Sequence, residues 1–325
     1  MRNRRKTAVV TLVLVAIATV GGAPSAAAGG EGRIAFARQL AGGGAQILTI
    51  NPDGSGESLV PVEGMPEDWA SPVWSPDGSR LLIANNLVLD ENGECCRTFR
   101  PATVDPDGSD YKLIDSPELP EAGMFCHAWS AGTTRLLCGV DSEGSISIRS
   151  TDGGDVRWLT TNPFGSNDVP WSLSPDGQRF AFLRYRPGPM PGPRPFVTEQ
   201  VGIFVANIDG SDVRQVVPYG VAEPHEFASA SWSPDGKMIM STTTRGRIFV
   251  VRLDGSGLNQ LTLEVTSKYF AYDPAWSPRG DRIVFTMFVN GQSDVYVADR
   301  DGSHLVQLTN TPDFEDGPNW GPTGS

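Results

Sequence analysis

One short pattern recurs six times along the chain. An apolar residue, usually tryptophan, precedes a turn of the Ser-Pro-Asp-Gly type, and a basic residue then opens an apolar run. The copies are centred on Trp74, Trp129, Leu173, Trp232, Trp276 and Trp320, at spacings of 55, 44, 59, 44 and 44 residues. The last copy ends at its turn, and the apolar run that it lacks lies at the other end of the chain, in residues 33–36. A repeat divided between the two termini is typical of a closed ring of repeats.

An Asp-Gly pair keeps step with this pattern. It occurs at Asp53, Asp107, Asp152, Asp209, Asp254 and Asp301, each preceded by an alternating apolar run. Asp-Gly between such runs favours a hairpin, because glycine tolerates the positive φ of a tight turn. Each unit of about 44 residues therefore predicts four antiparallel strands, A to D. The sequence predicts an all-β fold, a six-bladed β-propeller of four-stranded antiparallel blades, closed by N-terminal strands that pair with the C-terminal strand.

The tandem units, of the form W-S-P-D-G-x-x-I-x-F alternating with I-x-V-x-x-x-D-G-S-x-x-x-x-L-T, resemble the WD-repeat-like propeller repeats of the TolB family over about residues 32–325. The resemblance implies a composite blade, with strand A in residues 318–321 and the other strands in residues 33–60. It concerns the propeller part of TolB. We expect no room here for the separate N-terminal domain through which TolB contacts the cell-envelope machinery.

The repeated side chains are expected to be structural. The tryptophans should pack between blades. The basic residues that open the B strands should pair with turn carboxylates near the hairpin base; they are Arg33, Arg80, Arg135, Arg179, Lys237 and Arg282. The turn aspartates should hydrogen-bond the amides of their own turns.

The first 28 residues have the pattern of a secretory signal peptide: four basic residues, an apolar stretch from Thr7 to Val20, and the small residues Ala26, Ala27 and Ala28. We therefore divide the chain into a signal peptide, 1–28, and a propeller, 29–325. The mature protein is expected to be exported, either extracellular or held in the periplasm or cell envelope. Because no later run approaches the length of a membrane span, no integral membrane segment is expected in it.

Removal of the signal peptide takes the formal net charge from −12 to −16. Such a charge disfavours nucleic acid as a partner. A protein or peptide partner is expected, and the protein is expected to be a monomer. Closure of the ring leaves no free sheet edge.

Four cysteines, Cys95, Cys96, Cys126 and Cys138, are candidates for disulfides, because export favours oxidation. Cys126 and Cys138 flank one hairpin at equal distance from its turn and could face each other. Cys95 and Cys96 would then form a strained disulfide with each other or stay reduced. The crosswise alternative ties the loop of Cys95 and Cys96 to that hairpin. The spacing does not suggest zinc.

Function should lie where the blades differ. The segments between strands D and A precede the innermost strands, so their carboxylates should gather at the mouth of the central channel. The candidate binding residues are Glu67, Asp68, Asp168, His225, Glu226, Tyr272, Asp273, Glu315 and Asp316. We expect a non-enzymatic scaffold that binds a protein, a cation or a small polar ligand there. The alternative is an acidic rim that binds nothing.

Enzymatic signals are weak. The chain has no G-x-S-x-G or H-E-x-x-H motif, and the Asp-Gly turns do not fit an EF-hand. No catalytic residue, metal or cofactor is assigned. The alternative is an extracytoplasmic hydrolase or lyase acting on polysaccharide or peptide, with His127, His225, Glu226 and Asp273 as candidate metal ligands at the channel. A third possibility is an envelope-assembly component that keeps a TolB-like partner surface.

Overall fold

The computed structural model describes residues 30–323 apart from 42, 63–70, 85–86, 89–97, 115–123, 131–133, 141–143, 153, 161–166, 188–198, 222–226 and 266–267. The predicted signal peptide and its cleavage site lie outside these residues. Within them every regular element is a strand, and none is a helix that could cross a membrane.

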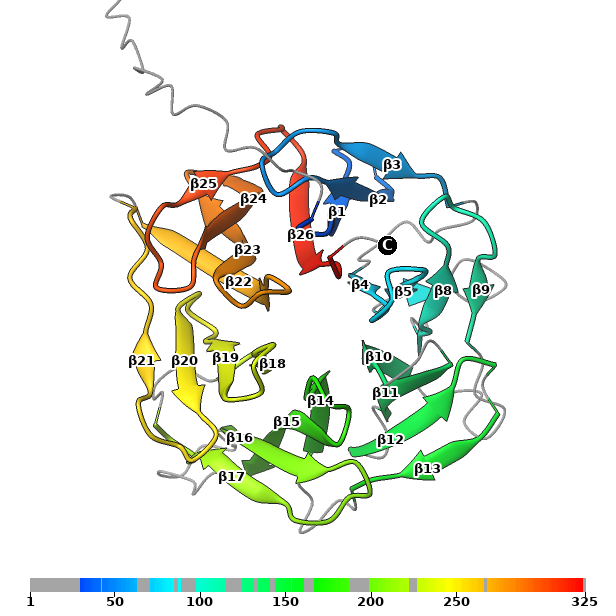
Figure 1. The fold of residues 1–325 in the computed structure, drawn as a ribbon, viewed down its shortest axis with the longest axis vertical. Helices are drawn as coiled ribbons and strands as arrows, with labels where there is room; N and C mark the ends of the chain where they lie inside the picture. The colour runs from blue at the N-terminus through cyan, green and yellow to red at the C-terminus, as the bar shows by residue number, and fades with distance from the viewer. Residues whose placement is uncertain are drawn as a thin grey trace, which may run out of the picture.

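Six four-stranded antiparallel sheets surround a central axis (Figure 1), which confirms the predicted propeller. The composite blade contains β26 (Phe314–Trp320), β1 (Ile34–Gln39), β2 (Ala45–Ile50) and β3 (Ser58–Val60). The next contains β4 (Pro72–Trp74), β5 (Leu81–Ile83), β8 (Ala102–Val104) and β9 (Lys112–Leu113). The third contains β10 (Met124–Trp129), β11 (Arg135–Val140), β12 (Ser145–Ser150) and β13 (Val156–Trp158).

The other three blades follow in chain order. One contains β14 (Asn167–Leu173), β15 (Arg179–Pro187), β16 (Glu199–Asn207) and β17 (Arg214–Val217). The next contains β18 (Ser231–Trp232), β19 (Met238–Thr242), β20 (Ile248–Arg252) and β21 (Asn259–Gln260). The last contains β22 (Tyr269–Trp276), β23 (Arg282–Val289), β24 (Gln292–Asp299) and β25 (Val306–Gln307). A separate two-stranded ribbon, β6 (Leu87–Val88) and β7 (Thr98–Phe99), lies in the insertion between β5 and β8.

The two ends of the chain share one sheet. In the antiparallel register of β1 and β26, Ile34 lies opposite Trp320 and Ala35 opposite Asn319. This confirms the composite blade. The innermost strands are longer than expected, however. Asp168, Asp273 and Asp316, predicted to lie in irregular connections, lie within β14, β22 and β26, because the partner strands β15, β23 and β1 continue past them. Asp168 pairs with Arg184 and Asp316 with Ala37, whereas Asp273 lies at a break in the register.

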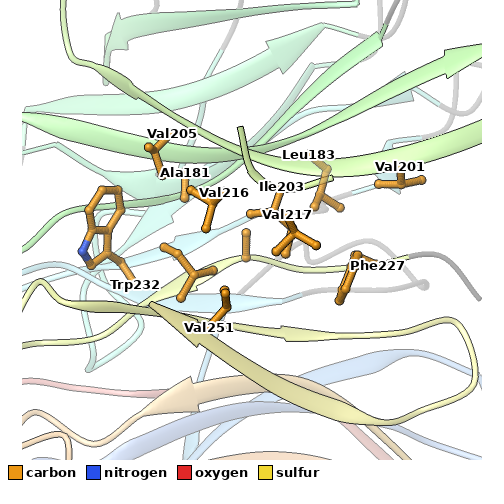
Figure 2. Close-up of a cluster of buried hydrophobic side chains, with 12 residues drawn as sticks. Ala181, Leu183, Val201, Ile203, Val205, Val216, Val217, Phe227, Trp232 and Val251 are labelled. Atoms are coloured by element: carbon orange, nitrogen blue, oxygen red, sulfur yellow. The ribbon is translucent and has the colours of Figure 1, made fainter. Parts of the chain in front are cut away.

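The apolar core lies between neighbouring blades. One cluster packs Leu183 and Ile203 of one blade against Trp232 and Val251 of the next (Figure 2). Three repeat tryptophans also donate an indole hydrogen bond across a blade boundary or to the N-terminal segment: Trp129 to the Val73 carbonyl, Trp276 to that of Ser231, and Trp320 to that of Glu31. The predicted role of the tryptophans between blades is confirmed.

The Ser-Pro-Asp-Gly turns are held by their own side chains. The carboxylate of Asp77 accepts hydrogen bonds from the Ser79 amide at 3.0 Å and the Ser75 hydroxyl at 2.7 Å. These bonds lower the pKa of Asp77 below its usual 3.8. The aspartates are therefore structural, as predicted.

In two blades the basic residue at the start of strand B forms ion pairs with the far hairpin of its own blade. Arg80 pairs with Asp105 and Asp110, which flank the Asp-Gly turn, and Arg135 pairs with Asp155. The predicted ion pairs therefore form in these blades, with the carboxylate supplied by the C–D end. Arg179 instead lies over the ring of Trp232, 5.0 Å from its centroid.

A candidate binding site in the central channel

Four of the innermost strands, β10, β14, β22 and β26, share a backbone irregularity. The register of β10 with β11 shifts between Cys126 and Ala128, which leaves His127 unpaired. Trp171 of β14 is skipped in the same way, and in β22 the shift passes over Asp273 and Pro274. A β-bulge of this kind redirects the extra residue out of the ladder.

These bulges line a cavity of about 270 Å³ to which all six blades contribute. The lining includes carboxylates, aromatic rings, hydroxyls and prolines; its residues are Ser71, Pro72, Val73, Ala84, His127, Ala128, Trp171, Ser172, Ser229, Ala230, Ser231, Asp273, Pro274, Ala275, Asp316, Gly317, Pro318 and Asn319. The repeat thus supplies the scaffold, and the bulged residues make each side of the cavity different.

Asp273 and Asp316, on the adjacent strands β22 and β26, form a hydrogen-bonded carboxyl pair. Burial raises the pKa of both groups, and the neighbouring negative charge raises the pKa of Asp316 further, well above 3.8. Two carboxylates in contact cannot both ionise readily, so the pair holds a shared proton at pH values where an isolated aspartate is ionised.

The backbone at Asp273 is strained. Its φ is +50°, a left-handed conformation that a residue with a Cβ adopts at some cost. The corresponding bulge position in β26 is Gly317, with φ +56°. The chain therefore places a carboxylate where the neighbouring blade has glycine. Such strain is concentrated at functional sites.

An aromatic pair lies on the other side of the ring. The His127 ring lies 4.6 Å from that of Trp171, centroid to centroid. Burial lowers the pKa of His127 to about 4, so its imidazole is neutral at pH 7. The Trp171 indole N–H is buried and has no acceptor among the described residues. In the order of the blades, β10 lies opposite β22 and β14 opposite β26 (Figure 1), so this pair faces the carboxyl pair.

Of the other predicted site residues, two form ion pairs away from the cavity lining. Asp168 is buried and accepts two hydrogen bonds from Arg184, at 2.6 and 2.7 Å. Glu315 is buried and lies 2.7 Å from Arg38 of β1, across the seam that closes the ring. Glu67, Asp68, His225 and Glu226 lie outside the described residues.

Tyr272 lines a neighbouring groove of about 440 Å³ at one rim, together with Phe270, Phe288 and threonines of β19 and the turn that follows it. Its hydroxyl shares a hydrogen bond of 2.7 Å with Ser293. Asp273 lines both this groove and the central cavity, so the two spaces meet at its side chain.

Sequence reasoning did not select Trp171, Ser229 or Asn319, and considered His127 only as a metal ligand. Their common signal is position: they lie one to three residues before the repeat tryptophan or its substitute, Leu173. Among the described residues, no three His, Cys, Asp or Glu side chains are grouped as a metal site.

A disulfide joins Cys126 and Cys138, which are direct partners in the register of β10 and β11. This is the first of the two pairings considered; Cys95 and Cys96 lie outside the described residues. Because His127 follows Cys126 directly, the disulfide fixes the strand at one of the bulges that line the cavity.

The six sheets and the shared terminal blade define the chain as a six-bladed β-propeller. Its sequence is 26% identical over 316 residues to an uncharacterized protein of Agrobacterium fabrum, covering 85% of this chain and 93% of that protein. It is 31% identical over 195 residues to the TolB homolog of Chlorobium luteolum, covering 55% of this chain and 40% of the homolog. The match thus spans less than half of that TolB relative.

Solved structures agree on the fold. TolB of Acinetobacter baumannii superposes with a TM-score of 0.66 at 18% identity, over 90% of this chain and 67% of that one. An oligogalacturonate lyase in complex with manganese superposes with a TM-score of 0.55 at 14% identity, over 78% of this chain and 71% of that one. No family model matches the sequence. In fold, the chain is a TolB-like β-propeller.

Proposed function

We propose that this protein is a non-enzymatic binding scaffold that acts outside the cytoplasm and engages a protein or a small polar ligand at the acidic side of its central channel. One observation carries the proposal. The bulges of the inner strands meet in one cavity, where a carboxyl pair, Asp273 and Asp316, replaces the apolar and small residues of the other blades. The rest of the repeat is used for packing and turn formation.

Three further features support an extracytoplasmic binding role. The N-terminal segment has the pattern of a signal peptide, and a disulfide is typical of oxidising compartments. TolB, with which the chain shares its fold, belongs by name to the Tol-Pal system in Anaeromyxobacter dehalogenans, a relative that is 32% identical over 121 residues.

A capture experiment tests this proposal. Protein purified from cells that express the full chain is immobilised and exposed to the exported fraction of the same cells. We expect the wild type to retain a defined partner or ligand that Asp273→Asn/Asp316→Asn does not retain. The matched control, Asp107→Asn/Asp209→Asn, removes two carboxylates from exposed hairpin turns and should retain it. Equal capture by all three proteins would reject the channel as the site.

The likeness to a lyase that holds manganese favours a second candidate, an extracytoplasmic hydrolase or lyase, because His127 and Asp273 line the same cavity. Elemental analysis of the purified protein separates the two. A stoichiometric transition metal that is lost in His127→Ala or His225→Ala, together with cleavage of oligogalacturonate, would favour the enzyme. Unchanged oligosaccharide and the absence of bound metal would favour the scaffold.

A further inference from the structure

The central cavity has two unlike walls. On one side are the carboxyl groups of Asp273 and Asp316; on the other are the rings of His127 and Trp171. The volume, about 270 Å³, lies just below the roughly 300–1,000 Å³ typical of ligand pockets, so it suits one side chain or a small molecule.

Prolines occupy a repeated position in the cavity lining. Pro72, Pro274 and Pro318 occupy the equivalent position, two residues before the repeat tryptophan or its counterpart, in three of the six inner strands. Proline has no backbone N–H. The residues that line the cavity include no lysine or arginine, and their side-chain donors, such as the serine hydroxyls and the amide of Asn319, are neutral, so the lining favours a cation over an anion.

The aromatic wall complements a positive charge. Because burial keeps the His127 imidazole neutral at pH 7, it does not repel a cation. An organic cation over an aromatic face gains about 0.5–2 kcal/mol, more when desolvated. A calcium ion instead takes about six to eight oxygen ligands, and among the described residues no three His, Cys, Asp or Glu side chains are grouped as a metal site.

From these features we propose that the cavity binds a singly charged organic cation of the kind found in the side chain of an arginine or lysine residue. This inference rests on the proposed binding function and names its ligand class. The same chemistry could come from a free amino acid derivative or from a residue of a peptide.

Isothermal titration calorimetry of the purified protein with N-acetylarginine amide tests the ligand class. The uncharged isostere N-acetylcitrulline amide is the matched probe, and we expect it to bind at least about tenfold more weakly, because a charge-assisted bond is lost. A tetrapeptide with one internal arginine distinguishes the sources: tighter binding than the single residue indicates a peptide, and weaker binding a free amino acid derivative.

Variants locate the site. Asp273→Asn/Asp316→Asn should abolish binding of N-acetylarginine amide. Asp316→Asn alone should keep it within a few fold at pH 7, because asparagine resembles the protonated member of the pair and leaves one negative charge. Trp171→Leu should weaken binding about tenfold, and Trp171→Phe by less, since it keeps the aromatic face.

Three results would overturn the inference: equal affinity for the arginine and citrulline probes, unchanged binding by the double variant, or stoichiometric calcium that competes with the arginine probe. The capture experiment above is independent. If the double variant loses its partner while N-acetylarginine amide does not bind the wild type, the scaffold stands and the ligand class is wrong. If neither effect is seen, both are wrong.

Discussion

Ile34 of the first strand and Trp320 of the last strand lie directly opposite each other in one antiparallel pair. Their side chains are buried in the same cluster, together with Phe36, Val284 and Val297. The closure of the ring therefore depends on apolar contacts that join the first strand, the last strand and the neighbouring blade.

Replacing Trp320 tests the strength of this closure. Trp320→Ala removes a buried ring and the indole bond to Glu31, and should lower the free energy of unfolding by about 3–5 kcal/mol. Trp158→Ala is the matched control. Its ring is 42% exposed at the outer edge of a blade and contacts Arg149, so the loss should be only about 1 kcal/mol. Urea denaturation followed by tryptophan fluorescence measures both, and equal losses would contradict a closure that depends on Trp320.

The ion pair at the same seam gives a pH-dependent prediction. Arg38 bridges Glu315 and Glu57, and burial raises the pKa of Glu315, which also faces Asp294. Arg38→Met leaves the carboxyl of Glu315 buried without its cation and should cost about 3–5 kcal/mol at pH 8. The pKa of Glu315 then rises further, so the folded state holds a proton that the unfolded state releases. The loss of unfolding free energy caused by Arg38→Met should therefore be smaller at pH 5 than at pH 8. Urea titrations at the two pH values measure it. Arg38→Met/Glu315→Gln should recover part of the stability, and no recovery would contradict this account.

The carboxyl pair in the channel should make the protein less stable at high pH. Because the pKa of Asp316 is raised on folding, the folded state holds more protons than the unfolded state above about pH 4, so stability falls as pH rises toward the folded pKa. One proton corresponds to at most about 1.4 kcal/mol per pH unit. Asp273, Tyr272 and the neutral His127 are the titratable groups described around it. Asp316→Asn should raise the melting temperature at pH 8 and leave it almost unchanged at pH 4. A decrease at pH 8 would contradict the proton-sharing pair.

The disulfide should contribute about 2–4 kcal/mol, because Cys126 and Cys138 are both buried and close a loop of 12 residues. Cys126→Ala/Cys138→Ala should show this loss in guanidinium denaturation. Dithiothreitol should destabilise the wild type by a comparable amount and leave the double variant almost unaffected. A large effect of the reductant on the variant would point instead to Cys95 and Cys96.

The two equivalent bulge positions should respond in opposite ways. At Gly317 a Cβ would lie 3.0 Å from the Ser71 hydroxyl, and its φ is +56°, so Gly317→Ala should cost about 1–3 kcal/mol. Asp273→Gly removes both the strain and a buried carboxyl group, and should raise the melting temperature. If Asp273→Gly lowered it, the aspartate would be a structural requirement rather than a residue kept for binding.

Much of the fold was predictable, because the repeat reports the same local structure six times. The hairpins, the composite blade and the position of the tryptophans all follow from residues that local geometry requires, such as the Asp-Gly pairs. The length of the inner strands was not predictable. It depends on how far β15, β23 and β1 continue, and Asp168 and Asp273 look like loop residues until that pairing is known.

The candidate site was predicted in part. Acidic composition near the inner strands pointed to Asp273 and Asp316, but it also pointed to Asp168 and Glu315, which are buried against Arg184 and Arg38. A carboxylate on these strands can point into the channel or toward an arginine. The strand register decides which, because a shift of one residue along a strand reverses the direction of the side chain.

The bulged positions of the inner strands have one more consequence. In β10, β14, β22 and β26 a channel residue lies at a break in the strand register, and the repeat tryptophan or leucine that packs between blades follows two or three residues later. A substitution at one of these positions changes one side of the lining while the hydrophobic contacts between blades stay as they are. The propeller can therefore acquire a new recognition specificity in small steps, by exchanging single residues around an otherwise constant frame.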